Sequence, residues 1–236
     1  MGKRIISQRR GKGSPTYKSP SHKFRAAVRH IGIKHNNLKG KITDIVTCPG
    51  HSSPLAVVKY ENGEQNHIIA PEGVHVEQEI EIGSENSVIG NCVALRNIPE
   101  GTQIYNIENQ PGDGGKFVRS SGLSAKVIAK YSKKIMVMLP SKKEKQFHPD
   151  CRANIGKIAG SGRTEKPIVK AGNAYYKNKA RNKLWPIVCG NSMNAVDHPY
   201  GTSRTSKKGR PTVARKHAPP GAKVGKIKAR RTGKRN

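Results

Sequence analysis

The chain is segregated by charge along its length, and this constrains its fold more than any other feature of the sequence. No acidic residue precedes Asp44, whereas residues 1–41 contain twelve lysines and arginines. Residues 42–110 carry ten carboxylates against two bases, residues 111–196 carry eighteen bases against four acids, and residues 197–236 carry thirteen bases and one acid. A segment with one sign of charge repels itself when it is compact. We therefore expect a folded acidic segment between basic segments that need a polyanionic partner.

The two ends of the chain have too few apolar residues to form a core. Only 33% of the 236 residues are hydrophobic, and the formal net charge is +30. Burial of so little apolar surface does not offset the conformational entropy lost on folding. We expect a basic arm over residues 1–41 and an extended basic tail over residues 191–236, both disordered when free and ordered against phosphates. No stretch has the length of a membrane span and the first residues lack a signal-peptide core, which predicts an intracellular protein without a membrane partner.

The middle of the chain predicts a mainly β protein with two small barrels. Short β-branched runs bounded by Pro, Gly and Asn occur at 41–46, 55–60, 66–70, 74–82 and 87–95. Five short strands in so few residues favour an OB-fold barrel over residues 42–110. Val74, Val76, Ile80 and Ile82 alternate with polar residues, as in a half-buried strand.

A second barrel, of the SH3-like type, is predicted over residues 111–190. Its strands are expected at 125–131, 134–140, 144–149 and 153–159. A helix is expected over residues 170–186, ended by Pro186, with Tyr176, Ala180 and Leu184 on one apolar stripe. The bases beside that stripe are Lys177, Lys179, Arg181 and Lys183. We interpret this helix as docked on the barrel with RNA along both flanks, and the alternative is a solvated helix.

The run "MNAVDHPYG" raises the question of catalysis because Asp197 precedes His198. Side chains adjacent in sequence rarely face each other, and catalytic partners usually come from separate elements. The sequence offers no nucleophile elbow and no convincing cysteine nucleophile. We therefore predict no enzymatic activity. His198 is interpreted as a hydrogen-bonding or stacking contact to RNA, with Asp197 orienting its ring.

The loop "PGDGGKF" resembles a phosphate-binding loop but lacks the Walker pattern. Phe117 follows Lys116 where a Ser or Thr would be required, so this is not a nucleotide site. Its three glycines would let the backbone approach an RNA phosphate, with Lys116 and Arg119 close by. A plain linker between domains is an equally good interpretation of the same residues.

Basic residues among glycine and serine favour contact with the RNA backbone. Arg152, Arg163 and Lys166 lie in such a stretch. Aromatic residues make up only 5% of the chain, which argues against reading of bases by stacking across a sheet. The expected mode of binding is recognition of the shape and backbone of folded RNA.

With these residues identified, the chain resembles large-subunit ribosomal protein two, a universal family, in its archaeal and eukaryotic branch. The resemblance extends nearly end to end and is carried by "GKRIISQRRGKGSPTYKSPSHKFRA", "PGDGGKFVRSSGLSA", "MNAVDHPYG" and "APPGAKVGKIKARRTG". It implies an OB-fold, an SH3-like barrel and extended tails. It also implies a structural role in the cytoplasmic ribosome, with binding of large-subunit ribosomal RNA, support of subunit assembly and association, and a tail near the peptidyl transferase region. The family histidine corresponds to His198, but the reaction centre is RNA.

The resemblance implies ribosomal RNA and other ribosomal proteins as partners, and we expect the acidic barrel to face solvent or the small subunit. No cofactor is expected, although magnesium ions could bridge through the RNA. Relatives usually have a glycine run after the His-Pro pair, and this chain retains only Gly201 early on, so Arg204, Lys207 and Lys208 are expected to compensate. The predicted RNA-binding residues are Arg9, Arg10, Lys12, Lys23, Arg25, Lys116, Arg119, Arg152, Arg163, Lys166, Lys177, Lys179, Arg181, Lys183, Asn194, Asp197, His198, Arg204, Lys207, Lys208, Arg210, Arg215, Lys226, Arg230 and Arg231.

Two other classes of protein share parts of this pattern. A chromatin-type protein that compacts DNA has a similar charge, but it has no need of an acidic barrel. An RNA-processing enzyme would need a second catalytic group beside His198, which the sequence does not offer.

Overall fold

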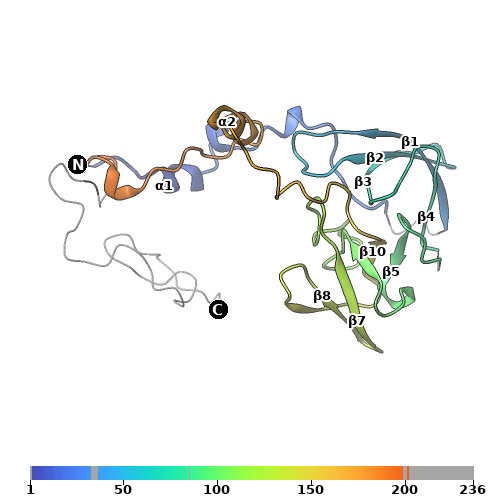
Figure 1. Ribbon diagram of the computed structural model, residues 1–236. Helices are drawn as coiled ribbons and strands as arrows, with labels where there is room; N and C mark the ends of the chain where they lie inside the picture. Colours follow the sequence, from blue (N-terminus) through green and yellow to red (C-terminus); the bar gives the residue numbers. More distant parts are fainter. Residues whose placement is uncertain (1, 33–36, 85, 199–200, 202–236) are drawn as a thin grey trace. The chain divides into compact units, whose positions relative to one another are not determined.

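The computed structural model describes residues 2–32, 37–84, 86–198 and residue 201 (Figure 1). The chain forms two compact units. The larger unit comprises residues 20–170, and the smaller unit combines the residues up to Ser19 with those from Ala171 onward.

The described part of the larger unit is built on one ten-stranded sheet, which confirms the mainly β prediction. Its strands are β1 (Leu38–Val46), β2 (Leu55–Tyr60), β3 (Gln65–Ile69), β4 (Glu79–Ile82), β5 (Cys92–Ala94), β6 (Gln103–Tyr105), β7 (Ala125–Tyr131), β8 (Lys134–Met138), β9 (Glu144–Phe147) and β10 (Arg152–Ile155). The strand order is β3-β2-β1-β4-β5-β10-β6-β7-β8-β9. β4 and β5 pair in parallel through Ile82 and Cys92, and the other pairs are antiparallel.

Two hydrophobic cores divide this sheet, in agreement with an OB-fold followed by an SH3-like barrel. The first core gathers apolar residues of β1 to β4, including Ile42, Val58 and Ile80. The second gathers residues of β5 to β10, and it begins at Val93. The predicted boundary at residue 110 therefore falls inside the second barrel. The boundary was misplaced because β5 and β6 belong to the second barrel through their pairing with β10. β10 is remote from both in sequence, so this pairing leaves no local signal.

The run at 74–82 forms a shorter strand than its alternating pattern predicts. Ile80 and Ile82 are buried in β4, whereas Val76 is 44% exposed and lies outside the strand. Glu77 has a φ of 73°, a left-handed conformation that interrupts the regular strand geometry. The strand therefore begins only at Glu79.

The inner part of the N-terminal arm (residues 20–32, the inner arm) belongs to the larger unit, and residues 2–19 (the outer arm) belong to the smaller one. Val28 is buried in a third core with Leu55, Tyr105 and Ile158, and Phe24 packs against it. A Cβ on Gly50 would lie 2.6 Å from the Phe24 ring, so a glycine is needed where this ring crosses the loop between β1 and β2. η2 (Ser21–Lys23) precedes this segment, and η3 (Leu95–Asn97) follows β5. The prediction of a single arm over residues 1–41 that becomes ordered only on RNA is therefore wrong for its inner part, which packs in the larger unit.

The described part of the smaller unit consists of short helices and turns. Its elements are α1 (Ile6–Gly11), η1 (Pro15–Tyr17), α2 (Ala171–Lys179) and η4 (Gly190–Ser192). α2 ends well before Pro186, so Leu184 is not helical, and Tyr176 is 68% exposed. The predicted apolar stripe is therefore not formed, because no residue of α2 is buried.

Candidate nucleic-acid interface

The smaller unit presents its cations to solvent. Arg9 and Arg10 lie in α1, which buries no residue, and Lys12 follows it. Lys177, Lys179 and Lys183 are exposed on α2 and its C-terminal turn, and Arg181 is partly exposed. The only acidic residue among the described residues of this unit is Asp197. This surface therefore attracts a polyanion with no carboxylate cluster to repel it.

Asn182 holds the C-terminal end of α2 against the outer arm. Its φ of 50° is left-handed, Lys183 N–H donates to Asn178 O at 2.9 Å, and Asn182 N–H donates to Lys179 O at 3.0 Å. These two bonds make a Schellman motif, which ends the helix. The Asn182 amide also donates to Thr16 O at 2.7 Å and to Lys18 O at 2.8 Å. Segments far apart in sequence thus display their cations from one folded unit.

The Asp-His segment is a compact turn. Asp197 N–H and His198 N–H both donate to Asn194 O, at 3.0 and 3.2 Å. The His198 ring lies so close to Gly190 that a Cβ there would overlap it. The Asp197 carboxylate lies 3.7 Å from Lys3 Nζ, so its ion-pair partner is a base of the outer arm.

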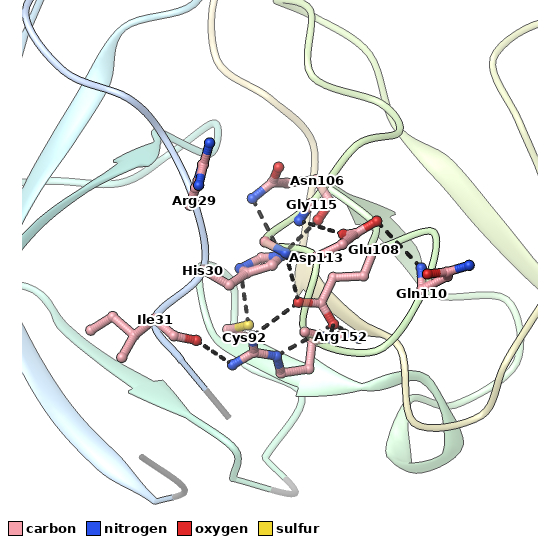
Figure 2. Close-up of polar contacts among 12 residues, drawn as sticks. Arg29, His30, Ile31, Cys92, Asn106, Glu108, Gln110, Asp113, Gly115 and Arg152 are labelled. Atoms are coloured by element: carbon pink, nitrogen blue, oxygen red, sulfur yellow. Dashed lines mark hydrogen bonds and ion pairs between the residues drawn. The ribbon is translucent and has the colours of Figure 1, made fainter. Parts of the chain in front are cut away.

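Arg152 is buried, which corrects its assignment as an RNA contact (Figure 2). Its side chain is 8% exposed, and its Nη2 lies 2.9 Å from Glu108 Oε1. Its Nη1 donates to Ile31 O at 2.7 Å, which ties the inner arm to the second barrel. A guanidinium placed among protein partners in this way cannot reach a phosphate. Its position in a basic, glycine-rich stretch gave no sign of burial.

Glu108 is the centre of this buried network. Besides Arg152, it accepts the backbone N–H of Gly112 and of Gly114, each at 3.2 Å. Burial by itself would raise the pKa of Glu108, but the hydrogen bonds from Arg152 outweigh burial and hold that pKa below its usual value. The carboxylate is therefore ionised at neutral pH.

The glycine loop lies between β6 and β7 of the second barrel and closes on carboxylates of the chain itself, so it is neither a linker between domains nor an open phosphate site. Asp113 accepts backbone N–H groups from Asn109, Gln110 and Gly115 at 3.0 to 3.3 Å, while Glu108 takes two more. A phosphate cannot use donors that are already engaged. Gly115 is required here, since its φ is 90° and a Cβ would collide with Asn106. Only the exposed Lys116 remains as a cation for RNA.

His30 fastens the inner arm beside this network (Figure 2). Its Nε2 lies 2.8 Å from Asn106 O, and its Nδ1 lies 3.3 Å from Cys92 Sγ. Burial lowers the pKa of His30 to about 4 and raises that of Cys92 to about 12. The neutral ring therefore donates a hydrogen bond from Nε2 to Asn106 O and accepts one from the Cys92 thiol at Nδ1.

The other predicted cations of the larger unit divide by exposure. Lys23, Arg25, Lys116, Arg163 and Lys166 are exposed. Arg119 is partly buried and donates to Val28 O at 2.8 Å and to Gly115 O at 3.0 Å, so it serves mainly to hold the inner arm. The predicted residues Arg204, Lys207, Lys208, Arg210, Arg215, Lys226, Arg230 and Arg231 lie outside the described residues.

Sequence reasoning missed a hollow at the β7–β8 hairpin, where Arg96, Lys130, Tyr131 and Lys133 come together. In the sequence, Lys133 lies between the strands predicted at 125–131 and 134–140, and Tyr131 beside it was the available signal of a binding surface. Among the described residues, no group of three His, Cys, Asp or Glu side chains is placed to hold a metal ion. None of the helices in the described part of the chain is long and apolar enough to cross a membrane.

Comparisons with known proteins place these features in a family. The model for Ribosomal Proteins L2, RNA binding N-terminal domain, matches residues 2–82, and that for Ribosomal Proteins L2, C-terminal domain, matches residues 88–221. The chain is similar to the large ribosomal subunit protein uL2 of Methanothermobacter thermautotrophicus (51% identity over 240 residues), of Methanosphaera stadtmanae (50% over 240 residues) and of Archaeoglobus fulgidus (48% over 236 residues). Each of these alignments covers all of both chains.

Proposed function

Because the chain belongs to the ribosomal protein L2 family, in its archaeal branch, we propose that the exposed cations of its smaller unit bind the backbone of large-subunit ribosomal RNA. As a member of that family, the chain is a structural constituent of the large ribosomal subunit and not an enzyme. Its partners are ribosomal RNA and other ribosomal proteins.

One observation carries the assignment of the surface. The described bases of the smaller unit face solvent from α1, from α2 and from the turns around them, and the one carboxylate among them is paired with Lys3. Lysines and arginines arranged in this way neutralise phosphates and release counterions, so binding weakens steeply with salt. The proposed contacts are Arg9, Arg10, Lys12, Lys177, Lys179, Arg181 and Lys183, with Lys23, Arg25, Lys116, Arg163 and Lys166 on the larger unit.

Sedimentation of a cell lysate on a sucrose gradient tests this function. The chain is expected to migrate with the large subunit and to leave that position after ribonuclease treatment. Purified chain should then bind folded large-subunit RNA more tightly than duplex DNA at the same salt concentration. Equal affinity for both would contradict recognition of RNA shape and favour a general polyanion binder.

We also propose that the acidic first barrel faces away from the RNA, towards a basic partner such as the small subunit. Glu61 and Glu64 stand exposed at the turn between β2 and β3, next to Asn62 and Gly63. These carboxylates would be repelled by the phosphates of RNA. Glu61→Lys with Glu64→Lys is expected to weaken subunit association in a light-scattering assay and to leave incorporation into the large subunit unchanged. Unchanged association would remove this face from the subunit interface.

A further inference from the structure

A groove lies beside the β7–β8 hairpin of the second barrel, outside the cations assigned above. It has a volume of about 610 Å³, within the usual range for small-ligand sites. The hairpin forms one wall, and η3 with the loop that follows β9 forms the other. Ile135, which is 1% exposed, lies beneath it. The remaining lining residues are Arg96, Lys130, Tyr131, Ser132, Lys133, His148, Pro149 and Asp150.

The groove favours a negatively charged ligand. Three of its lining residues are the permanent cations Arg96, Lys130 and Lys133. Its only carboxylate, Asp150, is paired with Arg96, whose Nη1 donates to Asp150 Oδ1 at 2.9 Å. Pairing of this carboxylate leaves a net positive lining.

The groove also presents an aromatic ring. Tyr131 is the last residue of β7 and is 57% exposed. The wall that carries it is held in place, because Lys130 N–H donates to Glu100 Oε1 at 2.8 Å and Lys130 Nζ donates to Arg96 O at 2.9 Å. β7 also has a bulge between Val127 and Ala129, a device that redirects side chains at the ends of strands.

We propose that this groove binds one unstacked nucleotide of RNA, with the base on the Tyr131 ring and a phosphate near Lys133. This inference rests on the RNA-binding function proposed above and adds to it a site that recognises a base. Stacking on an exposed aromatic ring beside cations is the usual way in which proteins hold unpaired bases. An acidic peptide would use the cations equally well but would leave the ring without a role.

A tryptophan reporter tests stacking at this position in the full chain. Trp185 is the only tryptophan, so Trp185→Phe with Tyr131→Trp confines the fluorescence to the groove. The matched control is Trp185→Phe with Ile128→Trp, because Ile128 is 39% exposed on the same strand, lies between Lys126 and Lys130, and does not line the groove. The probes are a single-stranded oligouridylate, whose bases are unstacked, an RNA duplex of equal length, and polyglutamate.

Oligouridylate is expected to quench the Tyr131→Trp reporter several-fold more than the Ile128→Trp reporter, and the duplex should quench neither strongly. Adding Lys133→Gln should raise the RNA concentration needed for half of the quenching. The proposal would be overturned if oligouridylate quenched both reporters equally, or if polyglutamate quenched the Tyr131→Trp reporter as strongly as oligouridylate does. In that case a gel shift of RNA by the wild-type chain would still support the general RNA-binding function. A wild-type chain that fails to shift RNA in a gel would instead overturn RNA binding itself.

Discussion

The two halves of the N-terminal arm are both basic and without acidic residues, but they differ in burial. Residues 2–19 contain six bases and no acid, and residues 20–32 contain three bases and no acid. The outer half stays at the surface of the smaller unit, whereas the inner half buries Val28, His30 and Ile31 in the larger one. A few apolar residues and one buried histidine make this difference. Basic charge alone therefore does not identify which residues meet RNA.

The largest effect is expected where the inner half meets the buried ion pair. Arg152→Met leaves Glu108 charged without its guanidinium partner, which should lower the free energy of unfolding by about 3–5 kcal/mol. Urea unfolding of the full chain measures this. Arg25→Met, at an exposed base of the same arm, is the control and should change stability by less than about 0.5 kcal/mol. Equal stability of the two variants would show that the pair does not hold the arm.

A second variant separates loss of the charge pair from loss of packing. Arg152→Met combined with Glu108→Leu removes both charges and should recover part of the lost stability. Recovery is incomplete because Ile31 O and the N–H groups of Gly112 and Gly114 lose their partners.

The second largest effect is expected from acid, which should lower the free energy of unfolding through His30 in the inner half. The pKa of His30 is about 4 in the folded protein against 6.5 for an ordinary histidine. The unfolded chain therefore binds the proton first as the pH falls, so stability is retained above about pH 6.5 and about 3 kcal/mol is lost by pH 4. Glu108, whose pKa is also lowered, adds a loss in the same direction at the acid end. His30→Gln should flatten the dependence of stability on pH in this window, whereas the exposed His75→Gln should not.

Packing of the inner half makes a smaller contribution to the free energy of unfolding. Val28→Ala removes two buried methyl groups and should cost about 2 kcal/mol in the free energy of unfolding. Ile6→Ala in α1, which has no buried residue, is the control in the outer half and should cost much less. Similar losses from both variants, measured by urea unfolding, would erase the distinction between the halves.

Bases of the outer half should affect RNA rather than stability. Arg9→Gln with Arg10→Gln should change the free energy of unfolding by no more than about 0.5 kcal/mol. It should reduce the slope of log affinity against log salt by about 1 for each phosphate contact that is lost. Filter binding of large-subunit RNA over a range of salt concentrations measures this slope. Glu61→Gln should leave the slope unchanged, and an unchanged slope in the arginine variant would remove α1 from the interface.

Local patterns predicted what is local in this fold. β2 and β7 have the bounds read from their β-branched runs, at 55–60 and 125–131. β6 was missed because its three residues gain strand geometry from pairing with β10, nearly fifty residues later. The predicted helix extends too far because Asn182 ends α2 in a left-handed conformation, which Asn adopts more readily than most residues. This cap is local, so Asn182 was its signal in the sequence, whereas the pairing of β6 with β10 depends on tertiary structure.

The candidate interface shows the same limit at single residues. Arg152 and Arg163 lie in one glycine-rich basic stretch, yet the first is buried against Glu108 and the second is exposed. Arg152 directly precedes the strand predicted at 153–159, whereas Arg163 follows a Gly-Ser-Gly run, but Glu108, which pairs with Arg152, is remote in sequence. The glycine loop did carry a signal, since Asp113 lies inside the motif and Glu108 shortly before it. Acids among those glycines indicated that the loop binds its own carboxylates.

The contact of Asn182 with Thr16 and Lys18 has a consequence for the order in which the parts of the protein fold during synthesis. Synthesis runs from the N-terminus, so the outer arm leaves the translating ribosome long before Asn182 exists to receive it. Throughout that interval the carbonyl groups of Thr16 and Lys18 lack the Asn182 amide that binds them in the folded protein. A newly made molecule therefore completes its smaller unit last, by joining its first residues to a segment translated near the end.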